Sequence, residues 1–299
     1  MSDKIIRGTA GNGSVRFFGI DCTETVKEAA EIHDLSTTST FYVGRMIQAA
    51  LIMGEDLKTP DSLITITLKT DGMANGTTVT ANGSNEVKCL TYADKDEVLS
   101  EDGTINVKQA IGNGNLVIIK DLGLKEPYTG TVELVYGEIA QDIAYYYLQS
   151  EQIPTAISLG VLVFGNEGVR KAGGFMVQLL PGAKENLIEK IEKNIQKFPN
   201  FTDMMDIGHS IEDLLINHIL KDLNAEVKAT KSVAYKCNCS KDKYKKGLAS
   251  LGIKELNDAI SYQNEIEVKC HFCNKRYLFS KDEVKSIILS ISGNKGRLL

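Results

Sequence analysis

Apolar residues in the first 180 positions alternate with polar ones in short runs, a pattern typical of strands that bury one face. Residues 77–92 contain two such runs around the turn Asn-Gly-Ser-Asn, which predicts a β-hairpin. Further runs predict strands at 14–20, 63–70, 115–123, 130–137, 155–164 and 175–182.

Three segments of the same region carry apolar residues at helical spacing: 23–34, 38–54 and 138–152. The strands come in runs and do not alternate strictly with helices. This order favours an α+β domain, with mixed or antiparallel sheets packed with helices, over a doubly wound parallel sheet. We place this domain at residues 1–183.

Residues 184–223 hold two helical patterns with no strand between them. Each has one apolar stripe on an otherwise polar helix, so each must dock on another surface. We interpret 184–231 as a helical linker lying on the first domain, although a helical part of the same core fits the pattern equally well. The stripes are Leu187, Ile191, Ile195 and Phe198, and then Ile207, Ile211, Leu214, Leu215 and Ile219.

The last module, 232–299, has strand-like alternation on both sides of a Cys-x-x-Cys sequence, which predicts a hairpin. Ser280 and Glu283 have the spacing of a capping box that opens a helix. This helix would bury Val284, Ile287, Ile288 and Ile291. The module is otherwise poor in aliphatic residues, so something besides its apolar core must hold it together.

Composition adds that the protein is an ordinary soluble one, with 42% hydrophobic and 24% charged residues. The first residues lack the apolar core of a signal peptide, and the most apolar stretch, 157–165, is too short to cross a bilayer. We therefore expect a cytoplasmic protein without a membrane partner, in a compartment that keeps thiols reduced.

Charge is distributed unevenly along the chain. From Lys228 onward, 15 Lys and Arg stand against seven Asp and Glu, a net charge of +8, whereas residues 1–227 carry 19 against 32, a net of −13. We hypothesise that the basic end of the chain docks on the acidic body and, if the protein switches between two states, helps to hold one of them. Added salt should then speed the change out of that state, and a rate that is flat with ionic strength would contradict the idea.

Four of the six cysteines form two close pairs in the last module: Cys237, Cys239, Cys270 and Cys273. Four thiolates in a tetrahedron make a closed zinc site, and a small module can depend on such a site to fold. Cys-x-x-Cys on a tight turn is a common half-site. Cys-x-Cys also works, because residues i and i+2 of an extended chain point the same way. We expect one Zn²⁺ here, with His271 facing solvent.

The same spacing permits redox chemistry. Seven basic residues near the four thiols should favour thiolates, which oxidants attack: Lys236, Lys243, Lys245, Lys246, Lys269, Lys275 and Arg276. Each pair can then close as a disulfide and release the metal. A bridge between i and i+2 would be strained and easily reduced, which favours a reversible switch. A purely structural zinc module fits the spacing equally well.

The rest of the sequence contains no recognisable active site. No nucleophile elbow, P-loop or zinc-protease motif is present, and the four histidines form no ligand pattern. Cys22 and Cys89 have the surroundings of small core residues. We therefore do not expect an enzyme.

Five blocks of the sequence are distinctive: "CNCS" with the distal "CHFC", "YYLQSEQIPTAISLGVLV" at 146–163, "KAGGFMVQLLPGA" at 171–183, "GRMIQAALIMG" at 44–54 and "DLGLKEPYTGTVELVYGEIAQDIAYYY" at 121–147. Together they resemble the bacterial 33-kilodalton redox-regulated heat-shock chaperone family. The resemblance covers nearly the whole chain.

The resemblance implies an ATP-independent holdase of the oxidative-stress response, inactive when reduced and zinc-bound. It implies that Cys237, Cys239, Cys270 and Cys273 bind zinc, and that they pair as Cys237–Cys239 and Cys270–Cys273 when oxidised. Residues 184–231 would be a metastable linker that unfolds when the zinc module, 232–299, collapses. The oxidised protein would form a homodimer and bind unfolding client proteins. Its client-binding candidates are Ile207, Ile211, Leu214, Leu215 and Ile219.

Two alternatives compete with this interpretation. A zinc-ribbon nucleic-acid binder would explain the basic module, but the acidic body would repel phosphate, and several of its candidate stacking aromatics should be core. These aromatics are Tyr235, Tyr244, Phe272, Tyr277 and Phe279. A thiol oxidoreductase would use the cysteine pairs for turnover, but the thioredoxin-like context is absent. We expect no nucleic-acid partner.

Overall fold

The structure, a computed structural model, describes residues 2–92 and 95–295. The chain divides into two compact units, Met1–Lys236 and Cys237–Leu299. Helices and mainly antiparallel sheets occur together in both, so the predicted α+β class is confirmed. Among the described residues, no helix combines the length and the apolar character needed to cross a membrane.

The first sheet of the first unit has five antiparallel strands with both faces covered. Its inner strand β9 is an almost continuous buried run, because one face packs on the main core and the other on the linker. In spatial order the strands are β10 (Glu226–Ser232), β1 (Lys4–Ala10), β2 (Val15–Asp21), β9 (Gly168–Leu179) and β8 (Thr155–Phe164).

The second sheet has six strands and contains the predicted hairpin. Thr78 pairs with Leu90 across it, and Asn85 takes the left-handed conformation in its turn, with φ 60°. All neighbours are antiparallel except β11, which lies parallel to β5. In spatial order the strands are β11 (Ala234–Tyr235), β5 (Glu86–Leu90), β4 (Thr78–Asn82), β3 (Leu63–Thr70), β6 (Gly114–Asp121) and β7 (Tyr128–Glu133).

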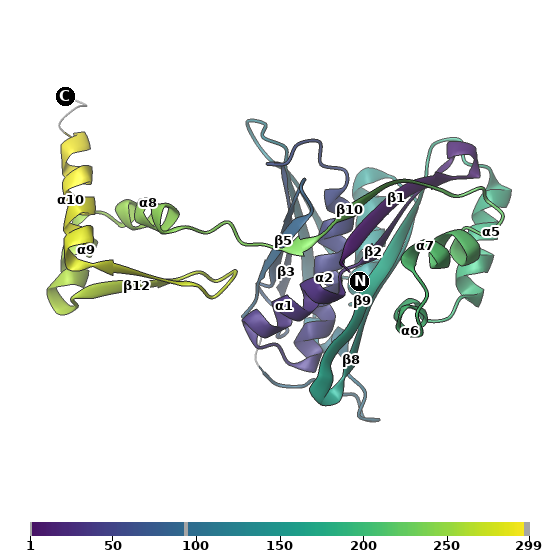
Figure 1. The fold of residues 1–299 in the computed structure, drawn as a ribbon, viewed down its shortest axis with the longest axis horizontal. Helices are drawn as coiled ribbons and strands as arrows, with labels where there is room; N and C mark the ends of the chain where they lie inside the picture. The colour runs from purple at the N-terminus through teal and green to yellow at the C-terminus, as the bar shows by residue number, and fades with distance from the viewer. Residues whose placement is uncertain (1, 93–94, 296–299) are drawn as a thin grey trace. The chain divides into compact units, whose positions relative to one another are not determined.

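Helix α2 (Thr37–Gly54) contacts both sheets and forms the centre of the main core (Figure 1). It is buried on nearly all sides, with only Thr37, Phe41 and Arg45 partly exposed, as expected for a helix between two layers. Ser36 caps it by accepting a hydrogen bond from the amide of Ser39. The other helical segments before the linker are η1 (Gly11–Gly13), α1 (Thr23–His33), α3 (Val107–Ile111), α4 (Ile139–Tyr146), η2 (Tyr147–Glu151) and η3 (Gly165–Glu167).

The segment predicted as a linker packs on the outer face of the first sheet, opposite α2. Its apolar side chains form a second core with residues of β1, β2 and β9, and its helices lie along this sheet in Figure 1. The predicted docking of the apolar stripes is therefore present. The elements are α5 (Glu185–Lys197), α6 (Phe201–Asp206), α7 (Ile211–Asp213) and η4 (Leu214–Ile219).

The structure corrects the prediction of one continuous stripe over 207–219. Gly208 has φ +108°, a conformation that ends the helix, and the chain restarts at α7 with Ser210 as its cap. Ile207 lies in this break and is 73% exposed, so it does not belong to the docked face.

Several other elements were missed or misplaced. Strands β1 and β10 were not predicted, and β10 makes the end of the predicted helical linker a strand paired with β1. Strand β9 begins seven residues before the predicted 175–182, and β7 begins and ends before the predicted 130–137.

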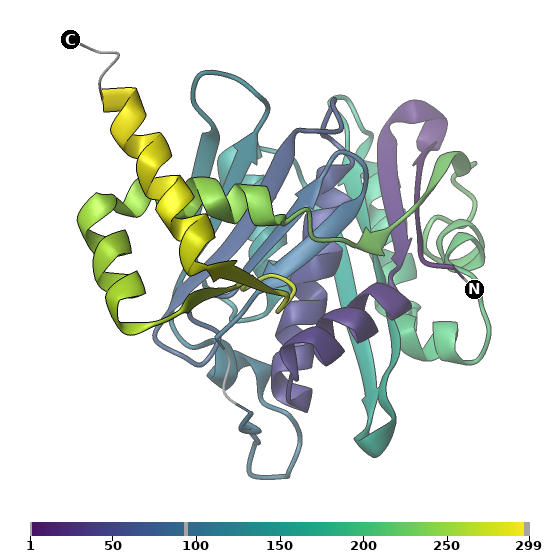
Figure 2. The same ribbon diagram turned by 60° about the vertical axis from the view of Figure 1, so that its left-hand side comes forward.

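The second unit is a hairpin covered by three helices (Figure 2). The predicted hairpin and capping box are confirmed: the Glu283 amide donates to Ser280 Oγ at 3.3 Å, and the Ser280 amide donates to Glu283 Oε2 at 2.9 Å. Helices α8 and α9 were not predicted. The elements are α8 (Lys241–Leu251), α9 (Ile253–Tyr262), β12 (Glu265–Lys269), β13 (Arg276–Ser280) and α10 (Lys281–Lys295).

The core of the second unit is small. Its buried cluster has seven members among the described residues: Leu248, Leu256, Ile260, Tyr277, Phe279, Val284 and Ile287. A core of this size contributes little stability to a unit of about 60 residues, so the unit needs a further constraint.

Candidate metal centre

Two local structures present the four paired cysteines in the second unit. Cys237 and Cys239 lie in the extended segment before α8, where Ser240 accepts a hydrogen bond from the Lys243 amide and caps the helix. Cys270 and Cys273 lie in the turn between β12 and β13.

Backbone hydrogen bonds fix the turn that carries the second pair. The amide of Cys270 donates to the carbonyl of Lys275 at 2.9 Å, and the amide of Asn274 donates to the carbonyl of Cys270 at 2.8 Å. Asn274 has φ 57°, a left-handed conformation that asparagine tolerates better than most residues. The turn therefore holds both sulfur atoms on one side before any metal binds.

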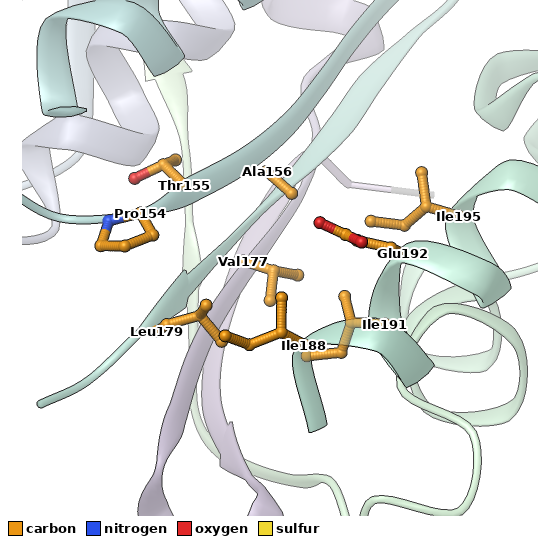
Figure 3. A pocket seen from close by; sticks show the side chains of 9 residues that line it. All are labelled: Pro154, Thr155, Ala156, Val177, Leu179, Ile188, Ile191, Glu192 and Ile195. Atoms are coloured by element: carbon orange, nitrogen blue, oxygen red, sulfur yellow. The ribbon is translucent and has the colours of Figure 1, made fainter. Parts of the chain in front are cut away.

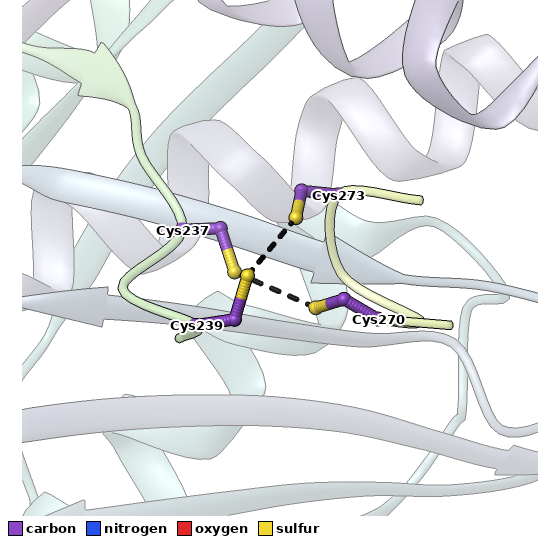
Figure 4. A group of neighbouring side chains, drawn as sticks. All are labelled: Cys237, Cys239, Cys270 and Cys273. Atoms are coloured by element: carbon purple, nitrogen blue, oxygen red, sulfur yellow. Dashed lines mark hydrogen bonds between the residues drawn. The ribbon is translucent and has the colours of Figure 1, made fainter. Parts of the chain in front are cut away.

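The four sulfur atoms converge on one point (Figure 4), and all lie within 4.8 Å of one another. Sγ of Cys237 is 3.7 Å from Sγ of Cys270, and Sγ of Cys239 is 3.4 Å from Sγ of Cys273. A tetrahedron with Zn–S bonds of about 2.3 Å has sulfur atoms about 3.8 Å apart, whereas a disulfide bond is about 2.05 Å long. The residues therefore fit a tetrahedral metal ion, and all four are free cysteines.

The thiols differ in acidity when no metal is bound. Burial raises the pKa of Cys270, but hydrogen bonds from the Tyr244 hydroxyl and from the amides of Phe272 and Cys273 outweigh it and lower the pKa to about 6. Burial is the first cause that raises the pKa of Cys237 and of Cys273. Of these three thiols, only that of Cys270 is ionised at neutral pH when no metal is bound. The thiols of Cys237 and Cys273 need the metal ion to lose their protons.

Two tyrosine hydroxyls surround the sulfurs. Tyr277 Oη is 3.1 Å from Sγ of Cys239, Tyr244 bonds to Cys270, and the two rings lie 5.1 Å apart. Such outer contacts orient metal ligands and tune their affinity. In the sequence both residues were among five candidate stacking aromatics, several of them expected in the core, and neither was assigned to the metal; strand alternation places Tyr277 on the buried face of β13.

Three of the seven basic residues near the thiols have contacts with groups other than the sulfurs. Lys236 pairs with Glu86, Lys243 Nζ donates to the carbonyl of Asn238 at 2.7 Å, and Lys275 lies over the ring of Tyr277. The low pKa of Cys270 thus comes from a hydroxyl and backbone amides. His271 is exposed and outside the ligand cluster, as predicted.

The remaining two cysteines are core residues, as predicted. Cys22 and Cys89 are fully buried in the main core. Burial raises the pKa of the Cys89 thiol to about 12 and that of Cys22 well above its ordinary value. Neither is a reactive thiolate at neutral pH.

Four of the five client-binding candidates are hidden in the second core. Ile211, Leu214, Leu215 and Ile219 are at most 2% exposed. They become accessible to another protein only if the linker leaves the sheet.

Glycines in the first sheet leave room for side chains of the linker. A Cβ on Gly19 would lie 2.4 Å from Cδ1 of Leu215, and one on Gly173 would lie 2.6 Å from Sδ of Met205. In the sequence, only the presence of glycine inside strand-like runs hinted at such close approach.

The docking of α5 is incomplete. Ile191 is its one fully buried residue, and no side chain caps its N-terminus. A cavity of about 160 Å³ lies beneath it (Figure 3), lined by Ile188, Ile191, Glu192 and Ile195 from the helix and by Pro154, Thr155, Ala156, Val177 and Leu179 from the sheet side. Lining atoms that face a cavity lose packing contacts, so this part of the linker is held weakly.

Comparisons with known proteins find similarity to one family over nearly the whole chain. The family model described as "Hsp33 protein" matches residues 3–280. A 33 kDa chaperonin of Clostridium perfringens strain SM101 is 42% identical over 293 residues, covering 96% of this chain and 92% of the relative. A 33 kDa chaperonin of Clostridium acetobutylicum is 39% identical over 298 residues, covering 99% and 100%.

The fold agrees as well. The crystal structure of the 33 kDa chaperonin, a heat shock protein 33 homologue, from Thermotoga maritima matches with a TM-score of 0.91 and 34% identity. The match covers 98% of this chain and all of that one. Together with the cluster of four cysteines, these similarities show that the chain belongs to the Hsp33 family of chaperones.

Proposed function

We propose that this Hsp33-type chaperone is a redox-regulated, ATP-independent holdase, inactive when reduced and zinc-bound and active after oxidation. The observation that carries the proposal is the convergence of four cysteine sulfurs in a unit with a small apolar core. Such a unit depends on its ligands for folding, so a change in their oxidation state changes its fold.

Zn²⁺ is the metal that these ligands favour. Four thiolates at tetrahedral spacing suit Zn²⁺, and a closed site of this kind supplies folding free energy in place of a large core. We propose Cys237, Cys239, Cys270 and Cys273 as its ligands. Removal of the metal should therefore unfold Cys237–Leu299.

Oxidation removes the ligands in pairs. Two equivalents of a two-electron oxidant such as hydrogen peroxide take four electrons from the four thiolates, form two disulfides and are reduced to four hydroxide ions. The metal then has no thiolate left. The family resemblance supports the pairs Cys237–Cys239 and Cys270–Cys273.

Trypsin can test this pairing. Cleavage after Lys236, Lys241, Lys269 and Lys275 places one pair in 237–241 and the other in 270–275. We expect two separate peptides, each two hydrogens lighter than its reduced form. A single species that joins the two peptides would show crossed pairing.

The chain itself supplies a path from the metal centre to the linker. Strand β11 ends two residues before Cys237 and is anchored by Tyr235, whose hydroxyl accepts from the amide of Cys89 at 3.2 Å. Before it, β10 is an edge strand without a fully buried residue. Unfolding of the second unit would free β11 and then β10, and it would loosen the end of η4.

The client-binding surface would be the second core laid open. Undocking exposes Ile211, Leu214, Leu215 and Ile219 together with the sheet face beneath them, and Ile207 is accessible already. A large contiguous apolar surface of this kind can bind the apolar segments of unfolded chains. This supports three domains: a client-binding and dimerisation domain at 1–183, a metastable linker at 184–231 and a zinc-binding redox domain at 232–299.

The proposal also includes the compartment, the oligomeric state and the absence of turnover. We propose that the protein acts in the cytoplasm, where thiols stay reduced until stress, that it forms a homodimer after oxidation, and that it acts without catalytic turnover. Against the nucleic-acid alternative, Tyr235, Tyr277 and Phe279 are buried and so cannot stack on bases.

The test is light scattering from a heat-unfolding client, with the protein either reduced and zinc-bound or treated with peroxide. Released zinc is followed with a chromogenic chelator in the same sample. We expect aggregation to be suppressed by the oxidised protein in proportion to zinc release. Equal suppression by both forms would remove the switch.

A further inference from the structure

A second group of metal-ligand side chains lies in the linker, within the first unit. His209, Asp213 and His218 each offer one ligand atom, and these atoms lie within 4.8 Å of one another. Nδ1 of His209 is 2.7 Å from Oδ2 of Asp213, and the two imidazole rings are 6.0 Å apart.

The local fold brings these residues together despite their uneven spacing. Asp213 is the last residue of the three-residue helix α7, where its amide donates to Oγ of Ser210, and His209 directly precedes this cap. The following turn, η4, is π-helical, with hydrogen bonds that close over five residues. It therefore turns His218 toward Asp213, five residues earlier. An α-helix would place residues i and i+5 about 140° apart.

The surroundings hold the three side chains in place. Asn217 Nδ2 donates to the other oxygen of Asp213 at 2.8 Å. The ring of His218 packs on Phe198, at the end of α5, at 5.6 Å. The hydrogen bonds from Asn217 and His209 lower the pKa of Asp213, which keeps the carboxylate charged. The cluster thus joins the end of α5, the α6–α7 break and η4.

We propose that His209, Asp213 and His218 form a second metal site, which binds a divalent transition ion of the zinc class through two imidazole nitrogens and one carboxylate oxygen. This donor set is typical of zinc sites with three protein ligands and water in the fourth position. The side chains are half-buried or exposed, so the ion enters directly from solvent.

Its position gives the site a consequence for regulation. A ligand that binds only the folded form stabilises that form by mass action, so a bound ion would hold the linker on the sheet. Zinc released by oxidation of the cysteines would then oppose the opening that its release triggers. This consequence rests on the proposed function, whereas the site itself does not.

Cobalt tests the site in the resting protein without a client. The full chain is reduced, saturated with one equivalent of zinc at the cysteines and titrated with Co²⁺, whose absorption separates sulfur ligands from nitrogen and oxygen ligands. We expect saturation at one further equivalent, with weak visible bands and no sulfur-to-cobalt charge transfer. Because loss of an outer-shell contact alone lowers metal affinity about 10- to 100-fold, His218→Phe and Asp213→Asn should each weaken binding at least about tenfold.

The variants are chosen to keep the fold. His218→Phe retains a ring against Phe198, and Asp213→Asn retains an acceptor for Asn217. Asp203→Asn, an exposed acid in the first turn of α6, is the matched control and should bind cobalt like the parent. Circular dichroism checks that each variant is folded. Non-saturable binding, sulfur charge-transfer bands, or undiminished affinity in His218→Phe would overturn the proposal.

Discussion

Leu215 tests whether docking of the linker keeps the protein inactive. Its side chain is fully buried in the second core, with Cδ1 over Gly19 at the centre of the first sheet. Leu215→Ala removes this contact and leaves the metal centre untouched. We expect the reduced, zinc-bound variant to suppress client aggregation without an oxidant.

The magnitude follows from the burial of the side chain. Truncation of a fully buried leucine to alanine costs about 3 kcal/mol, within a range of about 2–5. Since about 1.4 kcal/mol corresponds to a tenfold change, the docking equilibrium should shift about a hundredfold toward the open linker. A linker held by a margin of a few kcal/mol would then open in a measurable fraction of molecules.

Light scattering measures the chaperone activity of the variant, and limited proteolysis measures how far its linker opens. The variant should slow aggregation of a client under reducing conditions, and protease should cut it between 184 and 223 faster than the parent. Ile207→Ala is the matched control, because Ile207 lies in the same segment but is 73% exposed. It should behave like the parent in both assays.

A second substitution makes the test specific to packing. In the parent, Gly19→Ala would place a methyl group 2.4 Å from Leu215 and force the leucine aside. In Leu215→Ala the same methyl group enters vacated space, so its cost should be smaller there. The reasoning is refuted if Leu215→Ala opens the linker to protease but stays inactive, or if Ile207→Ala is equally active.

Four further predictions concern the metal centre and its connection to the first unit. Tyr277→Phe removes the hydroxyl 3.1 Å from Sγ of Cys239, so zinc affinity should fall about 10- to 100-fold in a competition titration. Leu278→Ala, on the exposed face of the same strand, is the control and should leave the zinc affinity unchanged. Chelation of zinc from the reduced protein should melt α8, α9 and α10 and leave the main core around α2 folded, and hydrogen exchange that stays slow in α8, α9 and α10 would contradict this. In rapid alkylation directly after zinc removal, before the second unit unfolds, the reaction of Cys270 should accelerate as pH rises through about 6, because its thiolate forms there, while Cys273, with its raised pKa, should react slowly up to pH 8 in peptide mass mapping. Tyr235→Phe leaves the buried amide of Cys89 without its hydroxyl partner, at a cost of about 1–3 kcal/mol. Hydrogen exchange in Glu226–Tyr235 should therefore become faster. Unchanged exchange would mean that the hydroxyl does not anchor this segment.

Local patterns predicted the cluster of four cysteines because it is recognisable from residue type and spacing. Cys237, Cys239, Cys270 and Cys273 are close in the sequence within each pair, and only one long-range step, the meeting of the two pairs, had to be assumed. The capping box at Ser280 and the hairpin at 77–92 were readable for the same reason.

The parts that were missed depend on contacts between distant segments. Strand β10 has alternating exposed and half-buried residues and is defined by its pairing with β1, more than 200 residues away. The break at Gly208 was hidden because the apolar residues on either side happen to keep helical spacing. The tyrosines around the sulfurs could not be assigned before the turn and α8 were placed next to each other.

The strand glycines beneath the linker also bear on which clients the opened surface could accept. Gly19, Gly160 and Gly173 leave shallow recesses, now filled by Leu215, Thr202 and Met205. The bottom of each recess is main chain without a side chain, so it selects little for the shape of the group that enters. Aliphatic, sulfur-containing and small β-branched side chains therefore all fit. The three side chains that now fill these recesses, from a leucine, a threonine and a methionine, are thus examples of the groups that the opened surface would accept from a client.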